Sequence, residues 1–523
     1  MRKSVVLVLL VYCASPALAD PPVTPARTEA HGGMNHDDMT APKTPQLMTG
    51  YGTGGFPITT KVPAAQAYFD NGMQLAHAFA HKASINAMAE AVRLDPNCAM
   101  CLWGLAWASG PTINYGKTSA ELEPLAEMAD KAAKLAEVSG TDRERRLIHA
   151  LQLRYKDGGG GKPGDLAFAK AMAALASQYP DDSEIAIIAA DAWLITKADT
   201  EEEWKLNADL AMPLLEGVLA RHPDDTGAIH FYIHATEAAG VAARAEPYAD
   251  KLARLAPRAS HLVHMPSHTY YWVGRYQDAA NANARAVEIG IENAKALGLP
   301  PPDGVWGLPY HVHNVTYGLG GALEAGDAKT ALALGRPLVE RSQVAESAGP
   351  YQQLISANGY FALALFAEPA EVLKLPQPKL PIVTVAWHYA RGEAFARLGD
   401  VKNVQAEALA IRALTGNIPD DGSRQAQQFT FIARNVLVGR AEMLLKHPRE
   451  AALAFQQAAE IQESKDFSTV SDPPAWYYPI RRDLAEAHLA AGDRAAALKE
   501  AQAALAYRVR DPGTEQLLKR LGK

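Results

Sequence analysis

The sequence lacks several features, and each absence excludes a class of protein. After the first residues, no stretch reaches the ~18 consecutive apolar residues that a transmembrane helix needs. No alternating run of β-branched residues is long enough to predict a sheet. The glycine-rich segment 157–164 lacks the Gly-Lys-Ser/Thr ending of a phosphate-binding loop, and no dinucleotide fingerprint or nucleophile triad stands elsewhere. Basic residues are outnumbered, 51 against 58 acidic ones, which argues against nucleic acid or an anionic membrane surface as a partner.

The first 19 residues have the pattern of a secretory signal peptide. Arg2 and Lys3 form a charged region, residues 5–11 form an apolar run, and Ala17 and Ala19 supply a small-x-small cleavage site. Cleavage would remove two of the 51 basic residues and leave a formal charge of −9 (49 − 58). We therefore expect an exported protein, periplasmic or secreted, with no membrane span.

The rest of the chain divides by its apolar pattern. From about residue 63 onward, Ala, Leu and aromatic residues recur with the period of amphipathic helices. The segment before it is dense in Pro, Thr, Gly and Asp and has no such period. The predicted organisation is a signal peptide (1–19), a disordered tail (20–62), an N-terminal helical array (63–366), a Pro-rich connector (367–383) and a C-terminal helical array (384–523). The expected fold class is all-α.

Two histidine pairs are separated by one fixed interval. His264 and His268 follow His230 and His234 by 34 residues each, and Gly-Arg-Tyr-Gln-Asp-Ala follows at 274–279. This pattern resembles tetratricopeptide (TPR) repeats, whose period is 34 residues. The resemblance covers about residues 63–515 and implies a solenoid of helical hairpins with a concave groove. Three segments (95–104, 261–268 and 476–479) are also similar to those of a group of exported bacterial TPR proteins.

The spacing of the histidines is typical of metal ligands. Histidines at i and i+4 share one helix face and can bind one ion. On the TPR pattern these positions line the groove, so side chains from three adjacent helices are expected to converge on one ion. The candidate ligands are His230, His234, His264, His268 and His313, with Glu237 and His261 as further ligands or as partners of the ligands. Imidazole suits copper and zinc, so the expected cofactor is one of these two, for metal handling or metal-dependent redox chemistry.

Other interpretations of the groove stay open at this point. The histidines can serve structure alone, by hydrogen bonding across helix interfaces. The chain can instead be a periplasmic interaction scaffold that holds a protein or peptide partner, with Tyr271, His311 and Arg482 as further groove residues. In a third interpretation the protein is a zinc hydrolase in which Glu237 acts as the base.

The cysteines allow two interpretations. Cys13 lies in the expected signal peptide, so Cys98 and Cys101 are the pair that remains. In an oxidising compartment they are expected to form a disulfide across a short loop. The alternative is a redox-active or metal-binding dithiol, because a Cys-x-x-Cys motif at a helix start favours the thiolate.

Two further groups of residues are candidate accessory metal sites. The tail contains a soft ligand set suited to copper, made of His31, Met34, His36 and Met39. His77 and His81 form another i, i+4 pair near the cysteines.

Overall fold

A computed structural model describes residues 45–156, 161–301, 303–414, 424–468 and 473–522. The described chain is helical and contains no β-strand, which confirms the expected all-α class. Residues 1–44, with the expected signal peptide and the His/Met group of the tail, lie outside the described residues. None of the described helices combines the length and the apolar character required to cross a membrane.

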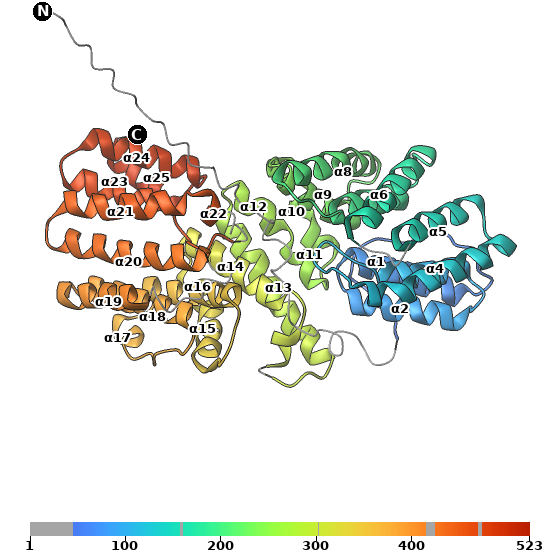
Figure 1. Ribbon diagram of the computed structural model, residues 1–523, viewed down its shortest axis with the longest axis horizontal. Helices are drawn as coiled ribbons and strands as arrows, with labels where there is room; N and C mark the ends of the chain where they lie inside the picture. The colour runs from blue at the N-terminus through green and yellow to red at the C-terminus, as the bar shows by residue number, and fades with distance from the viewer. Residues whose placement is uncertain (1–44, 157–160, 302, 415–423, 469–472, 523) are drawn as a thin grey trace, which may run out of the picture.

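The helices form two stacks with a central group between them (Figure 1). The first stack contains α1 (Pro63–His77), α2 (His81–Leu94), α3 (Ala99–Ala108), α4 (Ser119–Ser139), α5 (Asp142–Tyr155), α6 (Gly161–Gln178), α7 (Ser183–Ile195) and α8 (Glu201–Arg221). The central group contains α9 (Thr226–Ala238), η3 (Ala242–Ala245), α10 (Glu246–Leu255), α11 (Ser260–His264), α12 (Pro266–Trp272), α13 (Tyr276–Ala296), η4 (Gly304–Gly307) and α14 (His311–Ala325). The second stack contains α15 (Ala328–Val344), α16 (Pro350–Phe366), α17 (Pro369–Val372), α18 (Pro381–Arg397), α19 (Val401–Leu414), α20 (Arg424–Leu444), α21 (Pro448–Gln462), α22 (Lys465–Ser468), α23 (Arg481–Ala490), α24 (Arg494–Tyr507) and α25 (Pro512–Arg520).

Successive helices pack as pairs, as the repeat pattern predicts. The closest packing is between neighbours in sequence, such as α1 with α2, α13 with α14 and α20 with α21.

Local sequence sets where the helices begin and end. Thr118 and Thr141 start α4 and α5 with capping boxes, in which a Thr side chain and a Glu three residues later satisfy free backbone N–H groups. Gly326 ends α14 in the left-handed conformation that a residue with a side chain disfavours.

The buried apolar residues form two large clusters that meet at α13. The first cluster extends from Tyr51 to Ala279 and includes Tyr310, and the second extends from Ala280 to Ala487. Residues 367–383, expected as a connector between arrays, contain α17 and belong to the second cluster through Val372 and Leu380. The second apolar cluster therefore continues through this segment. The boundary between the two clusters lies instead on α13, in the central group that carries the histidines. The proposed domain boundaries stay a prediction.

Residues 45–62 differ from the disordered tail that their composition suggests. Tyr51 and Phe56 are buried, and the backbone between them is held by side chains of distant helices. The Gly55 N–H donates to the Glu184 carboxylate at 2.8 Å, and the Thr53 N–H donates to a hydroxyl on α9 at 2.7 Å. Because buried partners satisfy its polar groups, this segment ties α7 to the start of α9. Composition alone does not reveal such partners, since they lie more than 100 residues away.

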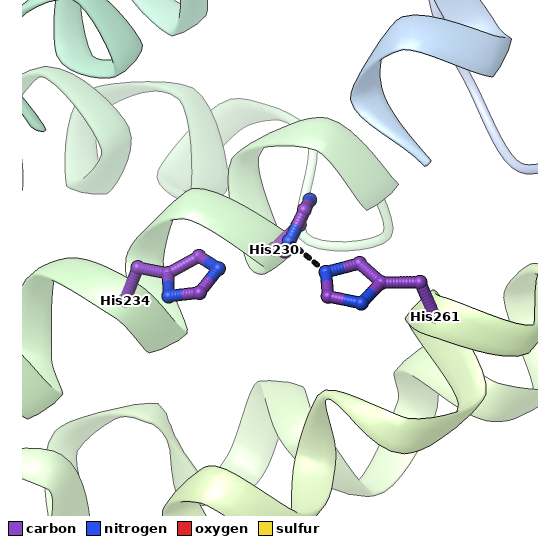
Figure 2. Close-up of side chains that lie close together, drawn as sticks. All are labelled: His230, His234 and His261. Carbon is purple, nitrogen blue, oxygen red and sulfur yellow. Dashed lines mark hydrogen bonds between the residues drawn. The ribbon is translucent and has the colours of Figure 1, made fainter. Parts of the chain in front are cut away.

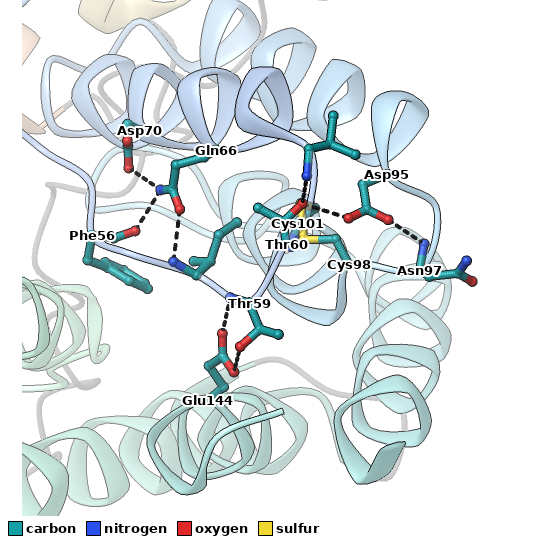
Figure 3. Close-up of a disulfide and its surroundings, with 12 residues drawn as sticks. Phe56, Thr59, Thr60, Gln66, Asp70, Asp95, Asn97, Cys98, Cys101 and Glu144 are labelled. Carbon is teal, nitrogen blue, oxygen red and sulfur yellow. Dashed lines mark hydrogen bonds between the residues drawn. A yellow bond between two sulfur atoms is a disulfide. The ribbon is translucent and has the colours of Figure 1, made fainter. Parts of the chain in front are cut away.

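The two cysteines are joined as a disulfide at the start of α3 (Figure 3). Cys98 is the N-cap residue of α3, its sulfur accepts the Cys101 N–H, and both residues are buried. Beside them the Thr60 hydroxyl donates to Asp95 at 2.6 Å, so the disulfide lies under the 45–62 segment. A buried, closed disulfide fits the structural interpretation better than a reactive dithiol.

Removal of this disulfide is expected to cost stability and leave metal binding unchanged. In the chain-entropy account, a loop of this size contributes about 2 kcal/mol to the free energy of unfolding. A Cys98→Ser/Cys101→Ser variant should lose about that much in urea unfolding, measured beside the parent protein. A loss of bound metal in the same variant, with helical content retained, would instead support a metal-binding dithiol.

Candidate metal centre

The histidines of the centre come from three neighbouring segments of the central group. His230 and His234 lie on α9, which begins where Asp225 accepts the Ala228 N–H. His261 and His264 lie on α11, and His268 lies in the first turn of α12. Pro266 stands at the first turn of α12, a position where its missing N–H costs no helical hydrogen bond. The last histidine, His313, lies in the first turn of α14.

Six histidines form two groups of three, with ligand atoms within 4.8 Å of one another in each group. The first triad is His230, His234 and His261, and the second triad is His264, His268 and His313. In Figure 2 the rings of the first triad, two from α9 and one from α11, point toward one another. Sequence spacing led us to expect convergence on one ion, whereas the ligand atoms fall into two adjoining groups of three.

The Nδ1 atoms of three of the histidine rings form hydrogen bonds with oxygen atoms. His230 Nδ1 donates to the backbone carbonyl of His77 at 2.7 Å. His264 Nδ1 donates to Asn283 Oδ1 at 2.6 Å, and the Asn283 amide NH2 donates to the Ala279 carbonyl, which sets the amide orientation. His268 Nδ1 donates to Glu237 Oε2 at 2.9 Å. A neutral imidazole that donates through Nδ1 has its lone pair on Nε2. These partners therefore leave the three Nε2 atoms as acceptors or metal ligands.

The Nε2 atoms of the second triad face one another closely. His264 Nε2 lies 3.0 Å from His268 Nε2 and 2.9 Å from His313 Nε2. When both rings of the first pair are neutral and donate through Nδ1, both Nε2 atoms have lone pairs, and two lone pairs at this distance repel unless a cation lies between them. Nitrogens that each lie about 2.0–2.1 Å from one ion are about 2.9–3.3 Å apart at angles between 90° and tetrahedral. The spacing of the rings therefore matches a shared ion. In the first triad His230 Nε2 and His261 Nε2 are 3.1 Å apart.

Burial keeps three of these rings, His230, His261 and His264, uncharged. It lowers the pKa of His230 to about 3, and lowers those of His261 and His264 well below the ordinary value of 6.5. Neighbouring imidazoles lower the pKa of His261 further, because a second positive charge nearby is unfavourable. At neutral pH these nitrogens are therefore unprotonated, the form that binds a metal.

Two aromatic residues with an unusual backbone enclose the first triad. Phe79 (φ 53°) and Tyr310 (φ 66°) adopt the left-handed conformation that residues with a side chain disfavour. Their rings contact His261 with centroid distances of 4.8 and 4.3 Å, and Phe79 also contacts His230 at 4.4 Å. Such backbones cost about 1–3 kcal/mol each and persist where the surroundings impose them, most often at functional sites. Here they exclude water from the apolar side of the triad.

Glu237 lies outside both triads. Its two oxygens accept from His268 Nδ1 at 2.9 Å and from Trp272 Nε1 at 3.0 Å. This contact with His268, a candidate ligand, fits a partner of a ligand better than a ligand. The same contacts disfavour a general base, because both oxygens are already engaged.

Other candidate residues are not members of the triads. His77 bonds Glu184 at 2.9 Å and His81 bonds the Tyr310 hydroxyl at 3.3 Å, so this i, i+4 pair has separate partners. The His311 ring packs on Trp306, with a centroid distance of 4.9 Å. Arg482, expected in the groove, pairs with Asp511 at 3.1 Å.

A small cavity of about 140 Å³ adjoins the second triad. Tyr271, expected as a groove residue, lines it together with Glu237 and Tyr317, and Arg508 approaches from the end of α24. The Tyr317 hydroxyl contacts His268 Nδ1 at 3.0 Å, so this cavity reaches the partners of a candidate ligand. Sequence reasoning did not identify Tyr317, although it follows His313 by four residues on the same helix face.

Replacement of Glu237 is expected to weaken metal binding at the second triad. A Glu237→Gln variant keeps the size and removes the charge that orients His268 and raises its basicity. Loss of such a partner typically lowers metal affinity about 10–100-fold. Competition titration against a chelator measures the change. The matched control is Glu246→Gln, whose carboxylate pairs with Arg275 on the surface. Equal affinities of the two variants would contradict this assignment.

No protein-family model matches the sequence, and no curated protein matches it. Solved structures with similar helical arrangements include the Cut9–Hcn1 hetero-tetramer of APC/C, 13% identical, covering 88% of this chain and 76% of that chain, with a TM-score of 0.30. The P58(IPK) TPR domain is 11% identical and covers 88% and 97%, with a TM-score of 0.22. Yeast Tom70 is 12% identical and covers 88% of each chain, with a TM-score of 0.24. Similarity this low assigns no function to this chain.

Proposed function

We propose that this protein is exported and binds a transition-metal ion, copper or zinc, through the Nε2 atoms of its clustered histidines. The observation that supports this most strongly is the His264–His268 pair. The Nδ1 atom of each ring bonds an oxygen, and the two Nε2 atoms lie 3.0 Å apart in a buried site, the spacing of two ligands of one ion.

The ligand chemistry narrows the choice of metal. Each triad is made of three imidazoles, which suit copper and zinc, whereas magnesium and calcium require oxygen ligands. Copper would support redox chemistry or copper handling. Zinc with three histidines and an open position could activate water, although the engaged carboxylate of Glu237 argues against that use.

The second candidate function is an interaction scaffold for a protein or peptide partner, and the stacked helical hairpins alone favour it. A specific observation adds to it: the cavity beside the second triad is lined by Tyr271 and Arg508 and by Trp272, whose side chain is 52% exposed. Aromatic and arginine side chains are common at binding surfaces. A scaffold would keep its partner after the histidines are replaced.

Elemental analysis separates the two candidates. The protein, expressed with its signal peptide and purified from periplasm without a His-tag, is compared with a His230→Ala/His234→Ala/His268→Ala variant. The matched control replaces three histidines outside the triads, His388, His447 and His488, with alanine. We expect copper or zinc in the parent protein and in the control, and loss of it in the triad variant. Absence of metal from the parent protein after incubation with copper and zinc would contradict the proposal.

A further inference from the structure

The two triads are the same unit, repeated once along the solenoid. Each contains an i, i+4 pair and one histidine from the next histidine-bearing segment. The pairs are 34 residues apart, since His264 follows His230 by that interval. The third member follows its pair by more residues in the second triad, with 49 residues between His264 and His313 against 31 between His230 and His261. The extra length is the loop that contains η4.

The triads adjoin each other. His261 of the first triad and His264 of the second share α11, with ring centroids 5.6 Å apart. His234 and His268 face each other across α9 and α12, also at 5.6 Å. Distances within the triads are similar, at 5.0 Å for His230–His234 and 5.8 Å for His268–His313. The six rings therefore form one continuous cluster, and ions in the two triads would be immediate neighbours.

Charge and coordination number both favour a ligand shared between the ions. Three imidazoles leave at least one position of a four-coordinate ion open. Imidazole binds a metal as a neutral ligand, and the carboxylate that contacts the second triad is that of Glu237, at the His268 ring. Two adjacent dications in a buried site repel each other strongly at low dielectric. An anion bound to both of them offsets that repulsion and occupies the open positions.

Building on the proposed function, we propose that the two triads hold two copper ions as one dinuclear centre, one ion per triad, bridged by a hydroxide derived from water. Copper is the ion chosen because nitrogen-donor sites bind Cu(II) most strongly among the first-row divalent ions. Formation of the bridge releases one proton from water to the solvent and changes no oxidation state.

Copper titration with electron paramagnetic resonance tests this centre. The metal-free full chain is loaded with Cu(II), and bound copper is compared with the integrated spin signal. We expect two coppers per chain and a signal far below the copper content, because two Cu(II) ions that share a single-atom bridge pair their spins. His264→Ala should retain one copper per chain with full signal. His388→Ala, which replaces a histidine bonded to Glu407 in the second stack, should behave like the parent protein. A His31→Ala/His36→Ala background removes copper held by the tail.

Each outcome has a distinct meaning. One copper per chain in the parent protein, or two coppers with full signal, would overturn the dinuclear centre and leave the proposed metal binding intact. No bound copper or zinc in the parent protein would overturn the proposed function itself. The titration of the parent protein decides these cases alone, so a His264→Ala variant that fails to fold does not weaken the test. Circular dichroism verifies that the variant retains its helical content.

Discussion

A His264→Ala variant is expected to bind metal at the second triad at least about 100-fold more weakly than the parent protein. Its Nε2 atom contacts both His268 and His313, so its removal takes away the atom that the other two ligands face. Loss of a partner behind a ligand already lowers affinity about 10–100-fold, and loss of the ligand itself exceeds that. Competition with a chelator of known affinity measures the effect.

The control for this variant replaces another buried ring side chain, away from the triads, with alanine. Phe361→Ala serves, since Phe361 is fully buried in the second stack. It should lower stability by about 3–5 kcal/mol and leave metal affinity unchanged. Unchanged affinity in His264→Ala itself would show that the second triad does not bind the metal.

Removal of the metal is expected to lower the free energy of unfolding by about 4 kcal/mol when free metal stands at 1,000 times its dissociation constant. The physical reason is that the ligands come from α9, α11, α12 and α14, which assemble only in the folded state. Urea unfolding with and without a chelator gives the difference.

The variant that lacks His230, His234 and His268 supplies the comparison for this second prediction. Its unfolding should not respond to the chelator, because both triads are broken. A chelator effect of the same size in that variant would place the stabilising ion elsewhere in the chain. No chelator effect in a metal-loaded parent protein would mean that metal binding is not coupled to folding.

The repeat interval predicted much of the centre. Equivalent positions in adjacent repeats lie side by side, so the 34-residue spacing correctly brought His230 near His264 and His234 near His268. Helical periodicity also predicted that each i, i+4 pair shares one face. The division into two triads was not predicted. It depends on where the first turns of α11 and α14, which carry His261 and His313, lie relative to the two i, i+4 pairs. Backbone geometry at Tyr310 and the loop before it decides that position.

The partners of the ligands could not be predicted from the sequence. The His230 ring is held by the carbonyl of His77, which any residue type would supply. Asn283 lies on a different helix from His264, and nothing in its local sequence distinguishes it from other asparagines. The same limit applies to residues 45–62, whose order depends on Glu184 and Thr226 rather than on their own composition.

The most direct test of the metal centre is anomalous X-ray diffraction from crystals of the copper- or zinc-loaded protein. The account predicts an anomalous peak at the absorption edge of the metal, about 2.0–2.1 Å from the Nε2 atoms of His264, His268 and His313. The dinuclear proposal adds a neighbouring peak at His230, His234 and His261. Crystals of a metal-loaded protein that show the anomalous signal elsewhere, with both triads free of it, would contradict the central claim.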